Sequence, residues 1–431
     1  MSKCAAIIIA AVLFGATVLK ASDVPEGNAI YDPSPNHLWN RLNETLFVRT
    51  AQDGKKYGLD ELDILYWLST TNLLSGTSHQ RALSVLDKFI NTHGERLVQD
   101  PLKKALLQRD LWALFDWSAF EEDFNHVPER KELQKRLAIA IRRLALTTNE
   151  IASLPDNYAQ AEKNHLPDLP RGLFQTNGDW INVVVNDAEL TVPAHVRGFG
   201  GRSVFAVLFH DADGRQAGMD YLKRLGAVRP MFVTVTNRDF QEELQLNPNL
   251  PQFPANSQWA LARRMCVIDT EGRIRLTRVI ESIQMRTYLN YNRFYGVARL
   301  DSNRPQHFNE FRMSRDAQAD LISVAQDEGG FTSNNRFFTM GFDPFELNRA
   351  GQTNQDAVTY RTRVLGNCME CHYAPGIFSV NSFTRFLSGG PTFQTTQMVG
   401  FDLGRDALET VNWKQRQFDW GLLQGLWIQE N

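Results

Sequence analysis

Apolar side chains recur at helical spacing through the first third of the chain. The clearest stretch carries apolar residues at intervals of four, four and three positions: Leu133, Leu137, Ile141 and Leu144. Basic residues flank this stripe, a pattern typical of an amphipathic helix. Residues 83–90 and 102–120 show similar spacing, with several aromatic residues that we interpret as core. The sequence therefore predicts a helical region over residues 32–155.

The pattern changes between residues 172 and 300 to short runs of β-branched and aromatic residues, which favour strands. The strand candidates are residues 180–185, 203–209, 231–236 and 265–268. Breaks rich in Gly, Pro and Asn separate them, and one helix is expected at 217–225. We interpret 198–201 and 210–214 as turns, since the first lacks the ending of a phosphate loop and the second lacks the remaining ligands of a calcium loop. This part is predicted to be a mixed α+β domain.

Two more helices are expected in residues 301–431, which read as mainly helical. Residues 353–356 have the form of a capping box, and no helix breaker follows before Leu365. A stretch with many apolar and aromatic residues then closes the chain at 406–427. The fold class predicted for the whole chain is α+β.

The pentapeptide Cys368-Met369-Glu370-Cys371-His372 carries the clearest chemistry in the sequence. Two thiols one helical turn apart, followed by an imidazole, are what covalent haem attachment requires. At this motif the chain resembles the c-type cytochromes. The resemblance implies one covalent haem c on Cys368 and Cys371, with His372 as the proximal iron ligand. The order of helix, motif, loop, methionine and closing helix is also similar to that of small mono-haem cytochromes c.

Two other interpretations of Cys368 and Cys371 remain open. The pair is also compatible with a dithiol or disulfide, or with part of a zinc site. A zinc site needs further ligands, and Cys266 is the one other cysteine outside the N-terminal segment. Cys266 lies in an apolar run, so we interpret it as a buried free thiol.

The resemblance implies Met398 as the sixth iron ligand, because no other methionine and no histidine follows His372. A thioether ligand raises the reduction potential and suits an electron carrier. The spacing from His372 to Met398 is short for that family, so Met340, His307 and an empty sixth position remain alternatives.

Side chains that would surround a haem are also present near the motif. Apolar walls raise the reduction potential of haem iron, and the loop after the motif is rich in phenylalanine. Arg361, Arg363 and Arg385 are candidate partners for the haem propionates. An ordinary core and exposed arginines explain the same residues equally well.

The N-terminus has the layout of a secretory signal peptide. Lys3 gives a positive start, and residues 5–19 are apolar and uncharged before a small-residue ending. We predict a signal peptide over residues 1–21, with an uncleaved anchor as the alternative because Leu19 is bulky for a cleavage site. Haem attachment at such motifs occurs outside the bacterial cytoplasm, so the predicted location is the periplasm or cell envelope.

Composition excludes some functions without choosing among the rest. The chain has 431 residues and a formal charge of −3, which gives no basic footprint for nucleic acid. No second apolar run is long enough to cross a membrane. The sequence thus predicts an exported mono-haem protein that transfers electrons to an unknown redox partner. The alternatives are a haem enzyme with an open iron site and a non-haem extracytoplasmic protein with a Cys368/Cys371 dithiol or disulfide.

Overall fold

The protein is described from a computed structural model. The described residues are 30–50, 56–57, 73–119, 126–183, 185–186, 190, 192–228, 232–236, 242–289, 306–315, 319–327, 376–377, 392–393 and 403–428. Every structural statement below concerns these residues. They form helices and an antiparallel sheet, which confirms the predicted mixed α+β class.

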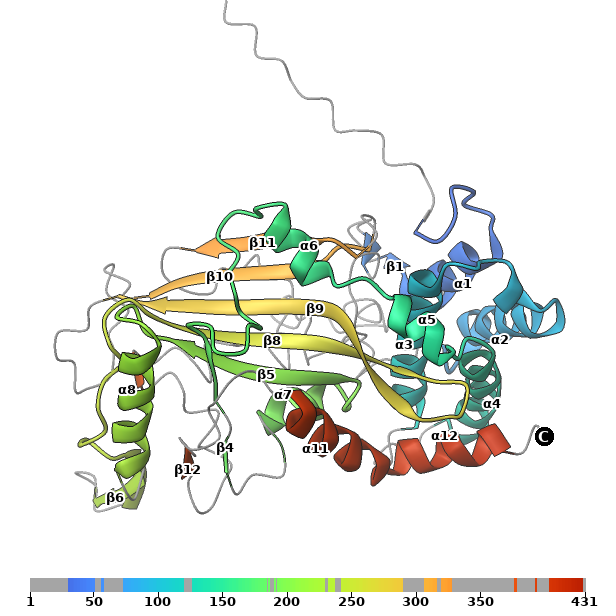
Figure 1. The fold of residues 1–431 in the computed structure, drawn as a ribbon. Coiled ribbons are helices and arrows are strands. Elements are labelled where there is room, and N and C mark those ends of the chain that lie inside the picture. The colour runs from blue at the N-terminus through green and yellow to red at the C-terminus, as the bar shows by residue number, and fades with distance from the viewer. Residues whose placement is uncertain are drawn as a thin grey trace, which may run out of the picture.

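A layer of helices is formed by the N-terminal part of the chain. Its members are α1 (Leu38–Phe47), α2 (Gly76–Asn91), the short 3-10 helix η2 (Gly94–Arg96), α3 (Pro101–Ser118), α4 (Val127–Arg143), α5 (Thr148–Ser153) and α6 (Asn157–Lys163). The three helices expected from apolar spacing correspond to α2, α3 and α4. In Figure 1, α1 to α5 gather at one end of the sheet, and α6 lies beside β10 and β11.

The central sheet has the strand order β11-β10-β9-β8-β5-β3, and each neighbouring pair is antiparallel. Its strands are β3 (Ile181–Asn182), β5 (Ser203–His210), β8 (Ser257–Ile268), β9 (Ile274–Tyr288), β10 (Gln306–Met313) and β11 (Leu321–Asp327). The β5 strand was predicted closely. The β8 strand starts eight residues earlier than predicted, and β9, β10 and β11 were not predicted. Charged residues interrupt the apolar runs of β9 and β10.

Short elements complete the described fold. The remaining strands are β1 (Arg49–Thr50), β2 (Lys56–Tyr57), β4 (Val185–Asn186), β6 (Phe232–Thr236), β7 (Glu242–Leu246) and β12 (Thr392–Phe393). They form the two-stranded pairs β1-β2, β4-β12 and β6-β7. The remaining helices are α7 (Pro193–Gly198), α8 (Arg215–Ala227), α11 (Leu403–Gln415) and α12 (Phe418–Ile428). The single closing helix predicted at 406–427 is therefore two helices, with a turn at residues 416–417.

The sheet is buried on both sides. Along β5, Val204 and Leu208 point into the core shared with α1 to α6 and α12. Phe205 and Phe209 point to the opposite side, where they meet α7 and α8. Because side chains alternate along a strand, this arrangement produces the continuous apolar run that the sequence shows at 203–209.

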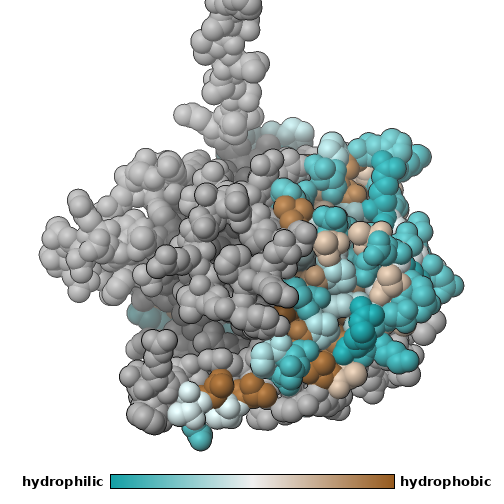
Figure 2. All heavy atoms as spheres, turned by 90° about the vertical axis from the view of Figure 1, so that its left-hand side faces the viewer, coloured by the Kyte–Doolittle hydropathy of each residue, from teal (hydrophilic) through white to brown (hydrophobic). Residues whose placement is uncertain are grey.

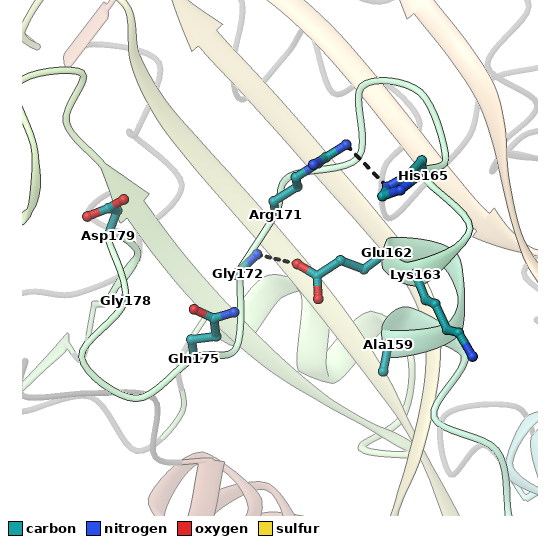
Figure 3. Close-up of a pocket in the computed structure, with 9 residues that line it drawn as sticks. All are labelled: Ala159, Glu162, Lys163, His165, Arg171, Gly172, Gln175, Gly178 and Asp179. Carbon is teal, nitrogen blue, oxygen red and sulfur yellow. Dashed lines mark hydrogen bonds between the residues drawn. The ribbon is translucent and has the colours of Figure 1, made fainter.

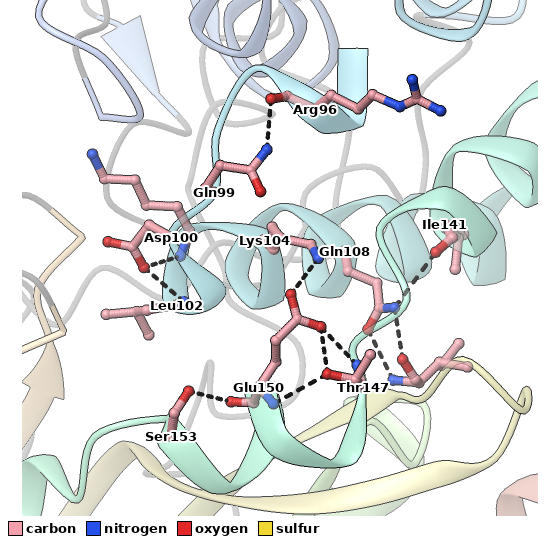
Figure 4. Close-up of polar contacts among 12 residues, drawn as sticks. Arg96, Gln99, Asp100, Leu102, Lys104, Gln108, Ile141, Thr147, Glu150 and Ser153 are labelled. Carbon is pink, nitrogen blue, oxygen red and sulfur yellow. Dashed lines mark hydrogen bonds and ion pairs between the residues drawn. The ribbon is translucent and has the colours of Figure 1, made fainter. Parts of the chain in front are cut away.

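Helix α3 joins the helical layer to the sheet. Asp100 caps its first turn through Leu102 N and Lys103 N, and Pro101 occupies the first position, where proline is tolerated. Further along, the Gln108 amide donates to Ile268 O at 2.9 Å and accepts from Ile268 N at 2.8 Å. Figure 4 shows Gln108 and the Asp100 cap on this helix. The end of β8 is thereby tied to α3.

Candidate functional site

The residues predicted to bind haem lie outside the described part of the structure. These are Cys368, Cys371, His372 and Met398, together with the alternatives and neighbours Met340, Arg361, Arg363 and Arg385. His307 is described, and it lies half-buried on β10 opposite Thr287 of β9. The site is therefore built from the two described segments that follow the motif, residues 376–377 and 392–393.

Gly376 and Ile377 form the first flanking anchor. Ile377 N donates a hydrogen bond to Gln252 Oε1 at 2.7 Å, and the Ile377 side chain is buried at 5% exposure. Gly376 has φ of +58°, and a Cβ at this position would lie 2.1 Å from Gln252 Oε1. Only glycine fits both the left-handed backbone and this close approach. The structure thus explains why a glycine stands four positions after His372.

The second anchor is β12, which pairs with β4 in the register Thr392↔Asn186 and Phe393↔Val185. It also lies against α8. Figure 1 shows the β4–β12 pair on the same side of β5 as α7 and α8. Both flanking anchors therefore belong to the side of the sheet that faces away from α1 to α6.

Covalent connectivity limits how far the predicted ligands lie from these anchors. His372 precedes Gly376 by four positions, a span of at most about 14 Å for a fully extended chain. Met398 is five positions from both Phe393 and Leu403, which allows at most about 18 Å from each. These limits follow from the length of the chain alone.

That side of the sheet is lined by large rings, which we call the aromatic face. Its members are Phe205, Phe209, Tyr221, Phe253, Trp259 and Tyr288. The ring centroids of Phe209 and Trp259 are 4.8 Å apart, and those of Phe253 and Tyr288 are 4.7 Å apart. Such pairs contribute stability beyond the area they bury. Ile377 belongs to the same buried cluster, so the anchor after the motif packs directly onto this face.

His195 of α7 is buried at the Phe205 end of the aromatic face. Its ring centroid lies 5.6 Å from that of Phe205. Burial lowers the pKa of His195 to about 4, and the positive charges of Arg286 and Arg263 lower it further in the same direction. The imidazole is therefore neutral near pH 7, the form in which histidine binds metals.

A buried carboxylate connects this end of the face to α3. Glu281 of β9 pairs with Arg109 of α3 at 3.3 Å and with Arg263 of β8 at 3.4 Å, and it accepts a short hydrogen bond from the Ser203 hydroxyl. The Glu281 side chain is fully buried. The Arg263 guanidinium also stacks over the Phe199 ring at 4.2 Å. The charged groups beside His195 are thus fixed by contacts on both sides of the sheet.

A pocket of about 550 Å³ lies elsewhere, between α6 and the loop that follows it (Figure 3). Glu162 is held there by Gly172 N at 2.6 Å, and Arg171 approaches the His165 ring at 3.4 Å. Its charged side chains carry both signs, and most of them are exposed. Among the described residues, no group of His, Cys, Asp and Glu is arranged to hold a metal ion. We assign no chemistry to this pocket.

Two further predictions concern residues that the structure describes. Cys266 is a fully buried free thiol, and burial raises its pKa to about 12, which confirms the expected inert cysteine. The segment 210–214 is a turn at the end of β5, as predicted, with Asp213 N donating to Asp211 Oδ1. Sequence reasoning missed Gln252 and His195, because neither residue belongs to a spacing pattern that signals a role.

Comparison with known proteins adds no family to this picture. No protein-family model, curated protein or solved structure shows significant similarity to the chain. Within the described ranges, no helix is long and apolar enough to cross a membrane. On the side seen in Figure 2, the described apolar residues form small patches among hydrophilic ones.

Proposed function

We propose that this chain is an exported mono-haem protein of the c-type cytochrome kind that transfers electrons. Cys368 and Cys371 would hold the haem through thioether bonds, and His372 would be its proximal iron ligand. The observation that carries the proposal is the complete pentapeptide, four positions before an anchor on a buried aromatic face. The region 301–431 would then be the cytochrome c-like part, and the location would be the periplasm or cell envelope.

The described residues fit a haem beside this face. A c-type haem must be shielded from water on most of its surface, and the hydrophobicity of its surroundings sets its potential. The aromatic face offers large buried rings within chain reach of His372. Arg286 adds positive charge at one end, the sign that haem propionates require, whereas the charge of Arg263 is already paired with Glu281. These features support a haem site built onto the sheet.

Met398 remains the proposed sixth ligand. It would supply a soft thioether that favours ferrous iron and suits an electron carrier. The alternative sixth ligand among the described residues is His195, because it is buried at the aromatic face and neutral near pH 7. His307 is less suited, because it lies on β10, three strands away from β5 in the sheet order.

The first test is the intact mass of the mature protein produced in a host with haem-attachment machinery. We expect the mass of the polypeptide plus one covalent haem, and a pyridine haemochrome spectrum of the c type. Cys266→Ala should keep the haem, whereas Cys371→Ala should lose the second thioether bond. A colourless protein with the bare polypeptide mass would overturn the proposal and favour the dithiol or disulfide alternative.

The second test identifies the sixth ligand on haem-loaded protein. Met398→Ala should convert the ferrous spectrum to a five-coordinate form that binds carbon monoxide. The buried core residue Met313 provides the matched control, and Met313→Leu should leave the spectrum unchanged. If Met398→Ala has no effect and His195→Ala opens the iron to carbon monoxide, the ligand is His195. If the wild type already binds carbon monoxide rapidly, an open-site haem enzyme becomes the better proposal.

A further inference from the structure

A buried cluster of four charged side chains fastens the C-terminal helices to the body of the protein. Lys414 of α11 donates from Nζ to Asp116 of α3 at 2.7 Å and to Asp419 of α12 at 2.6 Å. Arg202, just before β5, makes a short ion pair with the same Asp116 oxygen. Lys414 is fully buried, whereas Asp419 is 19% exposed. Four separate parts of the chain therefore meet at one point.

The turn between α7 and β5 allows this close approach. Gly200 and Gly201 both have positive φ, and a Cβ on Gly200 would meet Asp116 Oδ2 at 3.1 Å. A Cβ on Gly201 would meet the Trp413 ring at 2.9 Å. Glycine is required at both positions for conformation and for space. The turn predicted at 198–201 is confirmed over residues 199–201, whereas Gly198 is the last residue of α7. Gly200 and Gly201 make room for the charged cluster.

Two carboxylates share one ammonium group in this cluster. Since Asp116 and Asp419 each contact Lys414 Nζ, their oxygens are no more than about 5 Å apart. Two like charges this close disfavour each other's ionised form, and the more buried group takes up the proton more readily. Burial raises the pKa of Asp116 to about 6, with Asp419 raising it further and Lys414 and Arg202 opposing the change.

We propose that Asp116 is a pH-sensitive latch that sets how tightly α11 and α12 dock onto the body of the protein, where α11 packs against β5 and α12 packs against α3 and α4. When the two helices are docked, the Asp116 carboxyl is buried among the other three charged groups. When they move away, it meets water. The docked state therefore binds a proton that the undocked state releases, and docking strengthens as the pH falls. This inference does not depend on haem.

The charged groups that face Asp116 from each packed element are Lys414, Asp419 and Arg202. The nearby Arg130 of α4 points its guanidinium to the carbonyl oxygens of Trp117 and Ser118 at the end of α3. Arg142 of α4 also donates to Trp427 O of α12 at 2.8 Å, but arginine keeps its charge between pH 5 and pH 7.5. Asp406 of α11 is a further buried carboxylate, and the Asp116→Asn variant separates its pH response from that of Asp116.

Hydrogen exchange of the α11 and α12 amides, corrected for intrinsic rates, tests the latch in the full chain. From pH 7.5 to pH 5, we expect the opening equilibrium constant of these helices to fall by about 10-fold, with an upper limit of about 100-fold at lower pH. Asp116→Asn mimics the protonated state, so its opening constant should not change with pH. A flat profile in the wild type, or an unchanged slope in Asp116→Asn, would overturn the proposal.

Two further variants keep the test decisive. Asp419→Asn removes the neighbouring negative charge, so the midpoint of the transition should move to lower pH, and an unmoved midpoint contradicts the shared-ammonium geometry. Asp110 is the matched control, because it is a buried aspartate on the same helix that pairs with Arg315 and not with α11 or α12. Asp110→Asn should leave the pH response of α11 and α12 in place.

Discussion

The two sides of the central sheet are filled by different kinds of residue. Towards the helical layer, β5 and β8 present small or aliphatic side chains such as Val204, Leu208 and Ala262. On the aromatic face, the same strands present rings such as Phe209 and Trp259. Long helices cover the first side, while the described cover of the second includes α7, α8, Ile377 and Trp413 of α11. The rings of the second side pack against one another, and such pairs contribute stability beyond the area they bury.

The two sides also differ in how their buried ionisable groups respond to pH. The pKa of Asp116, on the helical side, is raised, so its contribution to the stability of the folded state increases as the pH falls. The pKa of His195, at the aromatic face, is lowered, so its contribution to the stability of the folded state decreases as the pH falls. The two shifts predict that the contributions of Asp116 and His195 to stability change in opposite directions between pH 4 and pH 6.

The largest expected effect comes from removing the carboxylate that connects the two sides. Glu281→Ala would leave the buried Arg109 and Arg263 without the negative charge that they share. Breaking a buried ion pair on one side typically costs about 3–5 kcal/mol. Chemical denaturation at pH 7 should show a loss of unfolding free energy of that size. Glu271 is exposed in the β8–β9 turn, and Glu271→Ala should cost less than about 0.5 kcal/mol. Equal losses in both variants would contradict the bridging role of Glu281.

The second prediction concerns acid sensitivity at the aromatic face. The pKa of His195 is about 4 in the folded protein and about 6.5 in an unfolded chain. The unfolded state therefore binds the proton first, and this contribution to stability is present above pH 6.5 and lost as the pH falls towards 4. Lowering the pH from 7.5 to 5 should cost the wild type about 2 kcal/mol more than it costs His195→Asn. Denaturation curves at both pH values measure this difference, and parallel losses would show that His195 is not buried as described.

The sequence predicted those helices and strands whose apolar residues follow a regular pattern along the chain. Helices α2, α3 and α4 follow from apolar residues spaced at three and four positions, and β5 follows from a continuous apolar run. The long strand β9 escaped prediction, because Arg275, Arg278 and Glu281 interrupt its apolar residues. Glu281 is buried against Arg109 of α3. A contact between residues so far apart in the sequence leaves no local pattern.

The candidate site divides in the same way. The C-x-x-C-H pentapeptide is a local pattern and can be found from the sequence, but the aromatic face comes from residues between 205 and 288 that the fold brings together. Gln252 and His195 gain their positions only through that fold. For this reason, the pentapeptide predicted a cofactor but not the surface that it would lie against.

The third prediction tests the anchor on the aromatic face. Gly376→Ala would force a Cβ against the Gln252 amide in addition to straining a left-handed backbone. Gly76 offers a matched control, since it has the same φ of +58° with nothing within 4 Å of an added Cβ. We expect Gly76→Ala to cost about 1 kcal/mol and Gly376→Ala about 1–2 kcal/mol more.

Limited proteolysis around residue 377 and the free energy of unfolding are the measurements for this pair. Adding Gln252→Ala to Gly376→Ala removes the close neighbour and should restore part of the lost stability. If the two glycine variants behave alike, the close approach to Gln252 does not hold the anchor in place.

The smallest expected effect lies at the exposed edge of the helical side, where Lys104 of α3 pairs with Glu150 of α5 at 2.6 Å (Figure 4). Burial acts to raise the pKa of Glu150, but hydrogen bonds from Lys104 and Thr147 hold it below its ordinary value. The pair therefore adds stability above pH 4.5 that is lost in acid. Because both side chains still reach solvent, at 15% and 26% exposure, Lys104→Met should cost about 0.5–1 kcal/mol, and this cost should shrink in high salt. The exposed Lys135 is the control, with no measurable change expected for Lys135→Met. A loss of unfolding free energy above about 2 kcal/mol for Lys104→Met would mean that this ion pair contributes as much as a buried one.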